Sequence, residues 1–173
     1  MEPLVHYALP LTALLLAGVQ PKKAAILAFL GVIPDIDALM LVHRSISHSI
    51  IIMGLIIAPL YLIAKIRYPD LKQPLLLAFL VLSSHPVLDL ESMTPILWPI
   101  TSNSYMLQLS LNGVMQEGFS LKPSITLSST PTAFTLAEGF DYPLFTENGF
   151  LIAVILLVPI AYNQIQTRFI QSK

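Results

Sequence analysis

Five apolar runs are the feature that most limits how this chain can fold. They cover Leu4–Val19, Ala24–Val42, Ile46–Ala64, Pro74–Leu90 and Phe150–Tyr162. A helix that crosses a bilayer needs roughly 17–25 mostly apolar residues. Only 11% of the residues are charged, whereas a soluble domain has about 25%. We therefore expect an all-α polytopic membrane protein with about five transmembrane helices, in which residues 1–173 form a single membrane domain.

The basic residues predict the orientation of these helices. With five spans, seven of the nine lysines and arginines fall on one side of the membrane: Lys22, Lys23, Lys65, Arg67, Lys72, Arg168 and Lys173. Loops rich in lysine and arginine stay in the cytoplasm. The sequence therefore predicts a multi-pass protein of the cytoplasmic (inner) membrane, with its N-terminus outside and its C-terminus in the cytoplasm.

The composition changes between residues 96 and 149, where Ser, Thr, Pro and Gly become frequent. The segments LQLSL and SITLS alternate apolar and polar residues, which is typical of strands, and Asn112-Gly113 predicts a tight hairpin turn between them. We expect residues 96–149 to form a small β-rich or irregular cap outside the membrane, inserted before the last helix. The sequence has no basic stripe suited to nucleic acid and no cysteine for a thiolate metal site.

Ionisable side chains interrupt four of the apolar runs. Counted along helices from the basic residues, they lie about 20–26 Å into a hydrocarbon core about 30 Å thick. An aspartate at a helix centre costs roughly 2.5–3.5 kcal/mol on insertion scales. Arg44 is the only basic residue near that depth, so a bound metal ion would supply the missing positive charge. The residues at this depth are His6, Asp35, His48, His85 and Asp89.

The spacing of these residues fits metal ligation. His85 and Asp89 are four apart and share a helix face. Asp35 and Asp37 face one centre only if their helix is disturbed, and Pro34 predicts such a disturbance. Imidazole and carboxylate ligands favour one or two Zn²⁺ ions, with Mn²⁺ or Fe²⁺ as alternatives.

Single residues of this set have simpler interpretations. His6 alone could be an interfacial polar residue, and Asp35 could cap a helix or pair with Arg44. Arg44 could be an anchor at the outer interface or a clamp for a substrate.

The motifs PDID, HRSISHS, HPVLDL and TPILWP follow an N-terminal histidine in this order. These ordered motifs resemble those of the YdjM-like family of membrane-bound metal-dependent hydrolases. The resemblance covers about residues 1–100. It implies that the family's polar positions are His6, Asp35, Asp37, His43, Arg44, His48, His85 and Asp89.

The chain is also similar, more faintly, to the zinc-dependent phospholipase C superfamily. That similarity implies one metal site made by Asp35, His48, His85 and Asp89. It implies a second site in which His6 shares Asp89. A further H-x-x-x-E motif of that superfamily is absent from this sequence.

Together these features predict a membrane-bound hydrolase that uses a metal-activated water to cleave a phosphoester, such as a phospholipid headgroup. Asp37 or His43 would orient a ligand or act as a general base, and Arg44 would hold the phosphate through its planar guanidinium group. Membrane lipid is the expected partner. The metal ligands would be His6, Asp35, His48, His85 and Asp89.

Two other functions are also compatible with the sequence. Intramembrane histidines and aspartates also mark ion paths, so the protein could transport metal ions or protons. A path needs polar groups at successive depths, which the cytoplasmic halves of the apolar runs lack. The chain could also be a structural membrane protein that a bound metal stabilises.

Overall fold

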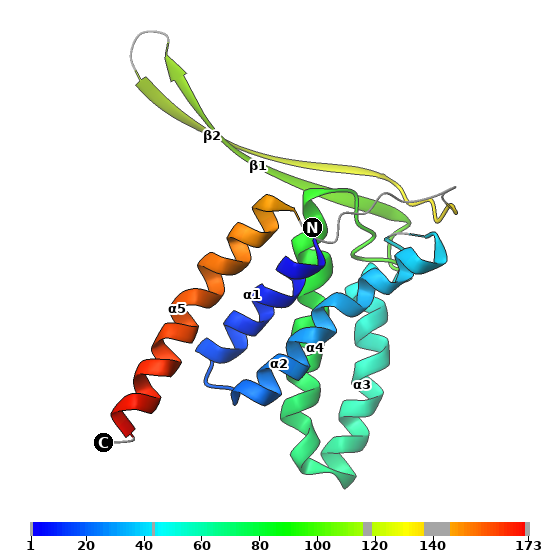
Figure 1. The fold of residues 1–173 in the computed structure, drawn as a ribbon. Helices are drawn as coiled ribbons and strands as arrows, with labels where there is room; N and C mark the ends of the chain where they lie inside the picture. Colours follow the sequence, from blue (N-terminus) through cyan, green and yellow to red (C-terminus); the bar gives the residue numbers. More distant parts are fainter. Residues whose placement is uncertain (1, 43, 116–118, 137–145, 172–173) are drawn as a thin grey trace.

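The computed structural model describes residues 2–42, 44–115, 119–136 and 146–171, and within them a helical bundle carries one long β-hairpin (Figure 1). The helices and strands are, in chain order, α1 (Pro3–Leu16), α2 (Pro21–Phe29), the 3₁₀ segments η1 (Leu30–Met40) and η2 (Ile46–His48), α3 (Ile50–Arg67), η3 (Pro69–Leu71), α4 (Lys72–Leu88), η4 (Asp89–Glu91), β1 (Asn103–Met115), β2 (Phe119–Pro131) and α5 (Glu147–Gln171).

Local sequence explains where several helices begin. Pro3 and Pro21 occupy the first turns of α1 and α2, where a missing N–H costs no hydrogen bond. Ser49 caps α3, because its Oγ accepts a hydrogen bond from the N–H of Ile52 at 3.3 Å. The Ser49 hydroxyl also donates to the carbonyl of Trp98, which ties the start of α3 to the segment that leads into the hairpin.

The helices pack around α1 and α4. The α1 helix contacts α2, α4, α5 and η1, and α3 packs beside α4. Leu14, Ala24, Ala28 and Val81 form the buried apolar core between them. The α1–α2 turn, the α3–α4 turn and the last turn of α5 lie at one end of the bundle, whereas the start of α1 and the hairpin lie at the other (Figure 1).

The prediction of an all-α polytopic protein with about five transmembrane helices is wrong. Among the described residues, two helical segments are long and apolar enough to cross a membrane, Ile50–Arg67 (18 residues) and Pro69–Glu91 (23 residues). Two shorter apolar helices cover Pro3–Leu16 and Glu147–Tyr162. The 14 residues of α1 extend only about 21 Å at 1.5 Å per residue, less than the roughly 30 Å hydrocarbon core.

The two candidate spans differ from the core helices of soluble proteins in their exposure. In the apolar windows of Ile50–Arg67 and Pro69–Glu91, only 11% and 28% of the residues are buried. Large apolar side chains of α3, such as Leu55, Leu62 and Ile66, are exposed. Apolar surfaces of this extent on a monomer mark contact with a membrane or with another protein.

The expected helix over Ala24–Val42 is interrupted at Leu30. The α2 helix ends after nine residues and continues as the eleven-residue 3₁₀ segment η1. Stretches of 3₁₀ helix longer than three or four residues are uncommon and often mark functional segments. Pro34 lies inside η1, where its missing N–H disfavours a regular α-helix.

The hairpin is longer than the sequence pattern predicted. Asn112 and Gly113 are not its turn; they pair within the ladder with Lys122 and Leu121, and the pairing continues to Met115 and Phe119. Residues 116–118 lie outside the described part of the chain. A Cβ on Gly113 would lie 3.2 Å from the ring of Phe119, so this ring covers the glycine. Apolar cross-strand contacts of this kind set the register beyond Asn112-Gly113.

Candidate metal site

Four ionisable side chains from separate segments meet at the hairpin end of the bundle. Asp35 comes from η1, His48 from η2, His85 from the last turn of α4, and Asp89 from the start of η4. Each offers one ligand atom, and the four atoms lie within 4.8 Å of one another. His48, His85 and Asp89 are 0% exposed and Asp35 is 8% exposed, so the cluster is shielded from solvent.

The distances between the ligand atoms approach those around a single ion. Four ligands of a tetrahedral zinc ion, each about 2.0–2.1 Å from the metal, lie roughly 3.3 Å from one another. Nε2 of His85 lies 3.0 Å from Nε2 of His48 and 3.4 Å from Oδ1 of Asp35. Oδ2 of Asp89 lies 3.4 Å from Nε2 of His48 and 3.7 Å from Nε2 of His85. Nε2 of His48 lies 4.0 Å from Oδ1 of Asp35.

A main-chain carbonyl orients the ring of His85. Its Nδ1 lies 2.6 Å from the carbonyl oxygen of Gly31. A carbonyl only accepts hydrogen bonds, so Nδ1 carries the proton and donates it. In the neutral ring, Nε2 is then the unprotonated atom, and it faces the cluster. Histidines that bind metals usually donate their other ring N–H in this way.

A carboxylate orients the ring of His48. Its Nδ1 lies 3.2 Å from Oδ2 of Asp37. The same oxygen accepts the hydroxyl of Ser47 at 2.7 Å and the backbone N–H of Ser45 at 2.8 Å. Asp37 is therefore held as a carboxylate behind His48, and Nε2 of His48 faces the cluster. Both aspartates of the PDID motif thus reach His48, from opposite sides of its ring.

The Nε2 atoms of His48 and His85 lie 3.0 Å apart. If both rings were neutral with the proton on Nδ1, the lone pairs of these two Nε2 atoms would face each other and repel. A positive charge between the two atoms removes this repulsion. Burial alone lowers the pKa of His48, but its hydrogen bonds to Asp37 and Asp89 and their negative charges raise this pKa above the ordinary 6.5. The cluster therefore stabilises a cation at this point, and a proton competes with a metal ion for it as the pH falls.

The two carboxylate oxygens of Asp89 face different groups. Oδ2 faces the four-atom cluster, whereas Oδ1 lies 3.1 Å from Nε2 of His6. The His6 ring, which is fully buried, stacks on the ring of His85 with the centroids 3.8 Å apart. His6 therefore supports both Asp89 and His85. Among the described residues, the four-member group is the one metal-binding cluster found, so His6 stands beside it.

Asp35 shows most directly that the cluster fits a cation. Neither of its carboxylate oxygens has a hydrogen-bond partner in the described part of the chain. A buried carboxylate without such partners is costly unless a positive charge lies close to it. The donor set of two imidazoles and two carboxylates is one that Zn²⁺, Mn²⁺ and Fe²⁺ accept.

The base of the hairpin holds the segment that carries Asp89. Thr94 is fully buried and pairs through its backbone with Tyr105 of β1. Its hydroxyl lies 2.8 Å from the carbonyl oxygen of Asp89, to which it donates. The hairpin thereby fixes η4 at the end of α4.

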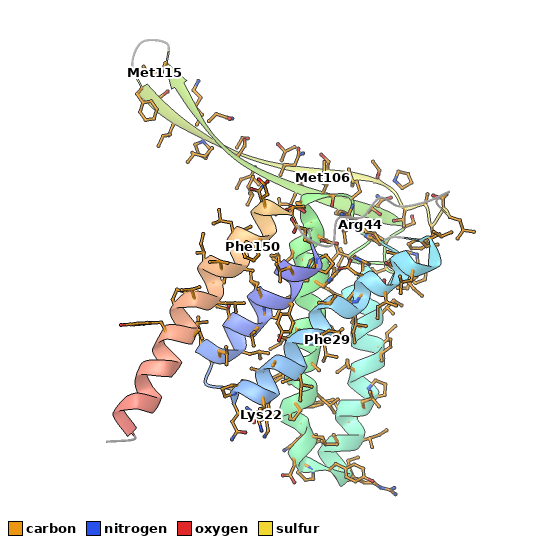
Figure 2. All side chains as sticks on the ribbon, viewed as in Figure 1. Lys22, Phe29, Arg44, Met106, Met115 and Phe150 are labelled. Atoms are coloured by element: carbon orange, nitrogen blue, oxygen red, sulfur yellow. The ribbon has the colours of Figure 1, made fainter. Side chains whose placement is uncertain are left out.

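Arg44 lies beside the cluster and is partly exposed. Its Nε lies 3.7 Å from Oδ2 of Asp89, and 25% of its side chain is exposed. Its backbone φ is +59°, a left-handed conformation that is uncommon for a residue with a side chain. Figure 2 shows Arg44 at the hairpin end of the bundle, opposite Lys22. His43, the third predicted catalytic residue, lies outside the described residues.

Two contributors were missed by the sequence analysis. Gly31 supplies the carbonyl that orients His85, and a Cβ at this position would collide with the carbonyl oxygen of His6. Ser47 was given no role in the site by the sequence analysis, and its hydroxyl donates to Asp37. The position of Ser47 next to His48 could have indicated its role, whereas no feature of the sequence indicated the role of the Gly31 carbonyl.

Comparison with known proteins adds one match. The family described as YdjM inner membrane protein matches residues 1–167. No match is found among curated proteins or among solved structures. The similarity to zinc-dependent phospholipases C is therefore not shown, and the family's description names no reaction.

Proposed function

The chain belongs to the YdjM inner membrane protein family, and on this premise we propose that it is a membrane-bound metal-dependent hydrolase that cleaves phosphoesters. The observation that carries the proposal is the cluster of Asp35, His48, His85 and Asp89, whose ligand atoms lie within 4.8 Å of one another. Two of the four are histidines held in the tautomer that ligation requires.

The residues of the chain divide into ligands and supports. Asp35, His48, His85 and Asp89 would hold the ion, with Zn²⁺ favoured and Mn²⁺ or Fe²⁺ as alternatives. When bound, such an ion supplies a water of lowered pKa and polarises a phosphoryl oxygen. Asp37 keeps the Nε2 atom of His48 directed at the cluster. His6 holds the far oxygen of Asp89.

Arg44 is the residue suited to the substrate. Its guanidinium group lies beside Asp89 and is partly exposed, so it can meet an anion that approaches the cluster. A planar guanidinium group binds a phosphate through two parallel hydrogen bonds. His43 is retained as a second candidate for proton transfer on the basis of the motif alone.

A membrane phospholipid is the substrate class that the position of the cluster favours. The cluster lies at the C-terminal end of the candidate span Pro69–Glu91 and just before the candidate span Ile50–Arg67. Lys65, Arg67 and Lys72 lie near the opposite ends of these spans. By the positive-inside rule, the cluster would then face away from the cytoplasm, level with lipid headgroups.

A structural metal site is the second candidate, and one observation favours it. Four protein ligands fill a tetrahedral zinc ion, whereas catalytic zinc sites keep a position open for water. Catalysis therefore requires that one ligand is weak or that the ion accepts a fifth ligand. Asp35 is the most exposed of the four and lies 4.0 Å from His48. It is therefore the ligand that a water molecule would most easily replace on the ion.

One preparation can separate these functions. Protein purified in detergent without chelator is analysed for metal and assayed against a panel of phosphoesters, including phospholipids. We expect about one transition metal ion per chain and turnover that a chelator abolishes. Metal that raises the unfolding temperature without any turnover would establish the structural role. Protein that is folded and active but free of metal would contradict both functions.

A further inference from the structure

A cavity lies at the end of the bundle opposite the metal cluster. Its volume is about 420 Å³, and its walls come from the α1–α2 turn, one side of α2 from Lys23 to Leu27, and the start of α4. Three polar side chains line it: Gln20, Lys23 and Gln73. The proposed hydrolase function uses none of these residues.

Among the described residues that line the cavity, Lys23 is the charged one, and Lys22 and Lys72 each lie next in sequence to a lining residue. Lys22 and Lys23 lie in the first turn of α2, and Lys72 is the first residue of α4. Neither first turn contains an acidic residue. Positive charges at a helix N-terminus are repelled by the helix dipole. An anion bound here would therefore be attracted both by the lysines and by the helix N-termini. Asp70, the acidic residue nearest in sequence to Lys72, is exposed and does not line the cavity.

The remaining wall is apolar. Val19, Ile26, Leu27 and Leu77 contribute it, and Ile26 is 74% exposed. Gly18 adopts φ +79° in the α1–α2 turn, and no heavy atom of the described residues beyond its two chain neighbours lies within 4 Å of the place that a Cβ would occupy. The turn therefore leaves open space beside the lysine, and an apolar surface continues from that space along α2 and α4.

We propose that this cavity binds the phosphate group of an anionic phospholipid. Lys23, Gln20 and Gln73 would contact the phosphate, and the apolar wall would contact the first part of the acyl chains. Lysine is a common phosphate ligand, and basic pockets between membrane helices bind anionic headgroups. A free phosphate ion shares the first set of contacts but leaves the apolar wall without an occupant, so a lipid fits the whole cavity better.

The test is a binding titration on the full chain purified in detergent. Native mass spectrometry would follow the binding of phosphatidylglycerol, phosphatidylcholine and inorganic phosphate. Lys23→Gln should weaken phosphatidylglycerol binding about tenfold, the effect of losing one charge-assisted hydrogen bond. Lys23→Arg should restore most of it. The matched control is Lys65→Gln, which removes the same charge from the last turn of α3, outside the cavity.

The controls decide the identity of the ligand. An equal loss in Lys65→Gln would show diffuse charge attraction and overturn the site. If phosphatidylcholine bound as tightly as phosphatidylglycerol, the net charge of the lipid would play no part in binding, and the proposal of an anionic lipid would be wrong. Inorganic phosphate that binds as tightly as the lipid would make this a free-anion site. Ile26→Gln should weaken lipid binding only. Metal content, which depends on the opposite end, should not change in any variant.

Discussion

At one end of the bundle, four ionisable side chains are buried around a common point, whereas at the other end lysine and arginine side chains are exposed in the terminal turns of helices. The first group, Asp35, His48, His85 and Asp89, has at most 8% exposure and comes from four segments. The second includes Lys22, Lys23, Lys65 and Arg67, which water can solvate. Met106 and Arg44 mark the first end and Lys22 marks the second in Figure 2.

This difference concerns how each end neutralises its charge. Buried ions lose their hydration, so each needs a partner at a fixed distance, and the loss of one partner is costly. Exposed ions are screened by water and salt, and single pairs among them contribute little. The cluster should therefore respond strongly to single substitutions, and the basic end should respond only when a ligand is present.

Asp89→Asn is the substitution with the largest expected effect. It keeps the size of the side chain but removes the charge that faces both His48 and His6. Breaking a buried charge pair costs about 3–5 kcal/mol, so metal affinity should fall at least about 100-fold and turnover should disappear. A metal titration with a competing chelator measures this. Glu91→Gln, an exposed carboxylate two residues further on, is the control; a similar loss there would contradict the assignment.

Asp37→Asn tests the support of His48 rather than a ligand. The amide can still accept one hydrogen bond, but it no longer attracts the proton on Nδ1 of His48. Loss of such a support typically lowers metal affinity about 10–100-fold. The same titration applies, with Asp70→Asn in the exposed turn η3 as the control. An unchanged affinity would mean that Asp37 only shapes the turn that contains Ser45 and Ser47.

Arg44→Lys separates substrate binding from metal binding. Lysine keeps the positive charge near Asp89 but cannot form two parallel hydrogen bonds to a phosphate. We expect kcat/KM for a phosphoester to fall about tenfold, with metal content unchanged. If the variant lost metal instead, Arg44 would be a counter-charge for Asp89, and its role in substrate binding would be wrong.

Glu2→Gln tests whether the burial of a carboxylate, rather than its position at the cluster end, determines how much its substitution destabilises the protein. Glu2 lies at the cluster end, but it is an accessible residue that binds the start of α5. The side chain and the backbone N–H of Thr146 both donate to its carboxylate, and the hydrogen bond from the Thr146 side chain does most to lower its pKa below the ordinary 4.5. We expect a small change, about 2 °C or less in unfolding temperature at neutral pH.

The pH dependence of this pair has a defined sign. Because the pKa of Glu2 is lower in the folded protein, its contribution is present above pH 4.5 and is lost as the pH falls through the lowered value. The difference between the native protein and Glu2→Gln should therefore shrink below pH 4.5. A difference that grew in acid would contradict the hydrogen bonds to Thr146.

Much of the candidate site was predictable because buried charge is rare. An aspartate or histidine in an apolar run needs a partner, and His6, Asp35, His48, His85 and Asp89 were identified by this argument. The structure brings all five together. The disturbance predicted at Pro34 is present as the 3₁₀ segment η1. These inferences depend on residue type and depth, both of which a sequence contains.

Helix length was not predictable from hydrophobicity. The run Ala24–Val42 is apolar enough for one span, but packing against α1 and α4 divides it into α2 and η1 at Leu30. Hydrophobicity measures the preference for an apolar environment, which a short 3₁₀ segment in a bundle satisfies as well as a helix that crosses the membrane. This break removes one of the five expected spans, and the apolar helices Pro3–Leu16 and Glu147–Tyr162 are too short to count as two more.

The sequence by itself determined which side chains must find partners and that residues 96–149 contain strands. Only the tertiary structure decided which nitrogen of His85 faces the cluster. That choice depends on the carbonyl of Gly31. Because every residue has a main-chain carbonyl, the residue type at position 31 does not predict this hydrogen bond. The tertiary structure also decided the hairpin register. The Phe119 ring packs on Gly113 across the strands, so the strand pairing continues past Asn112-Gly113, where the sequence predicted the turn.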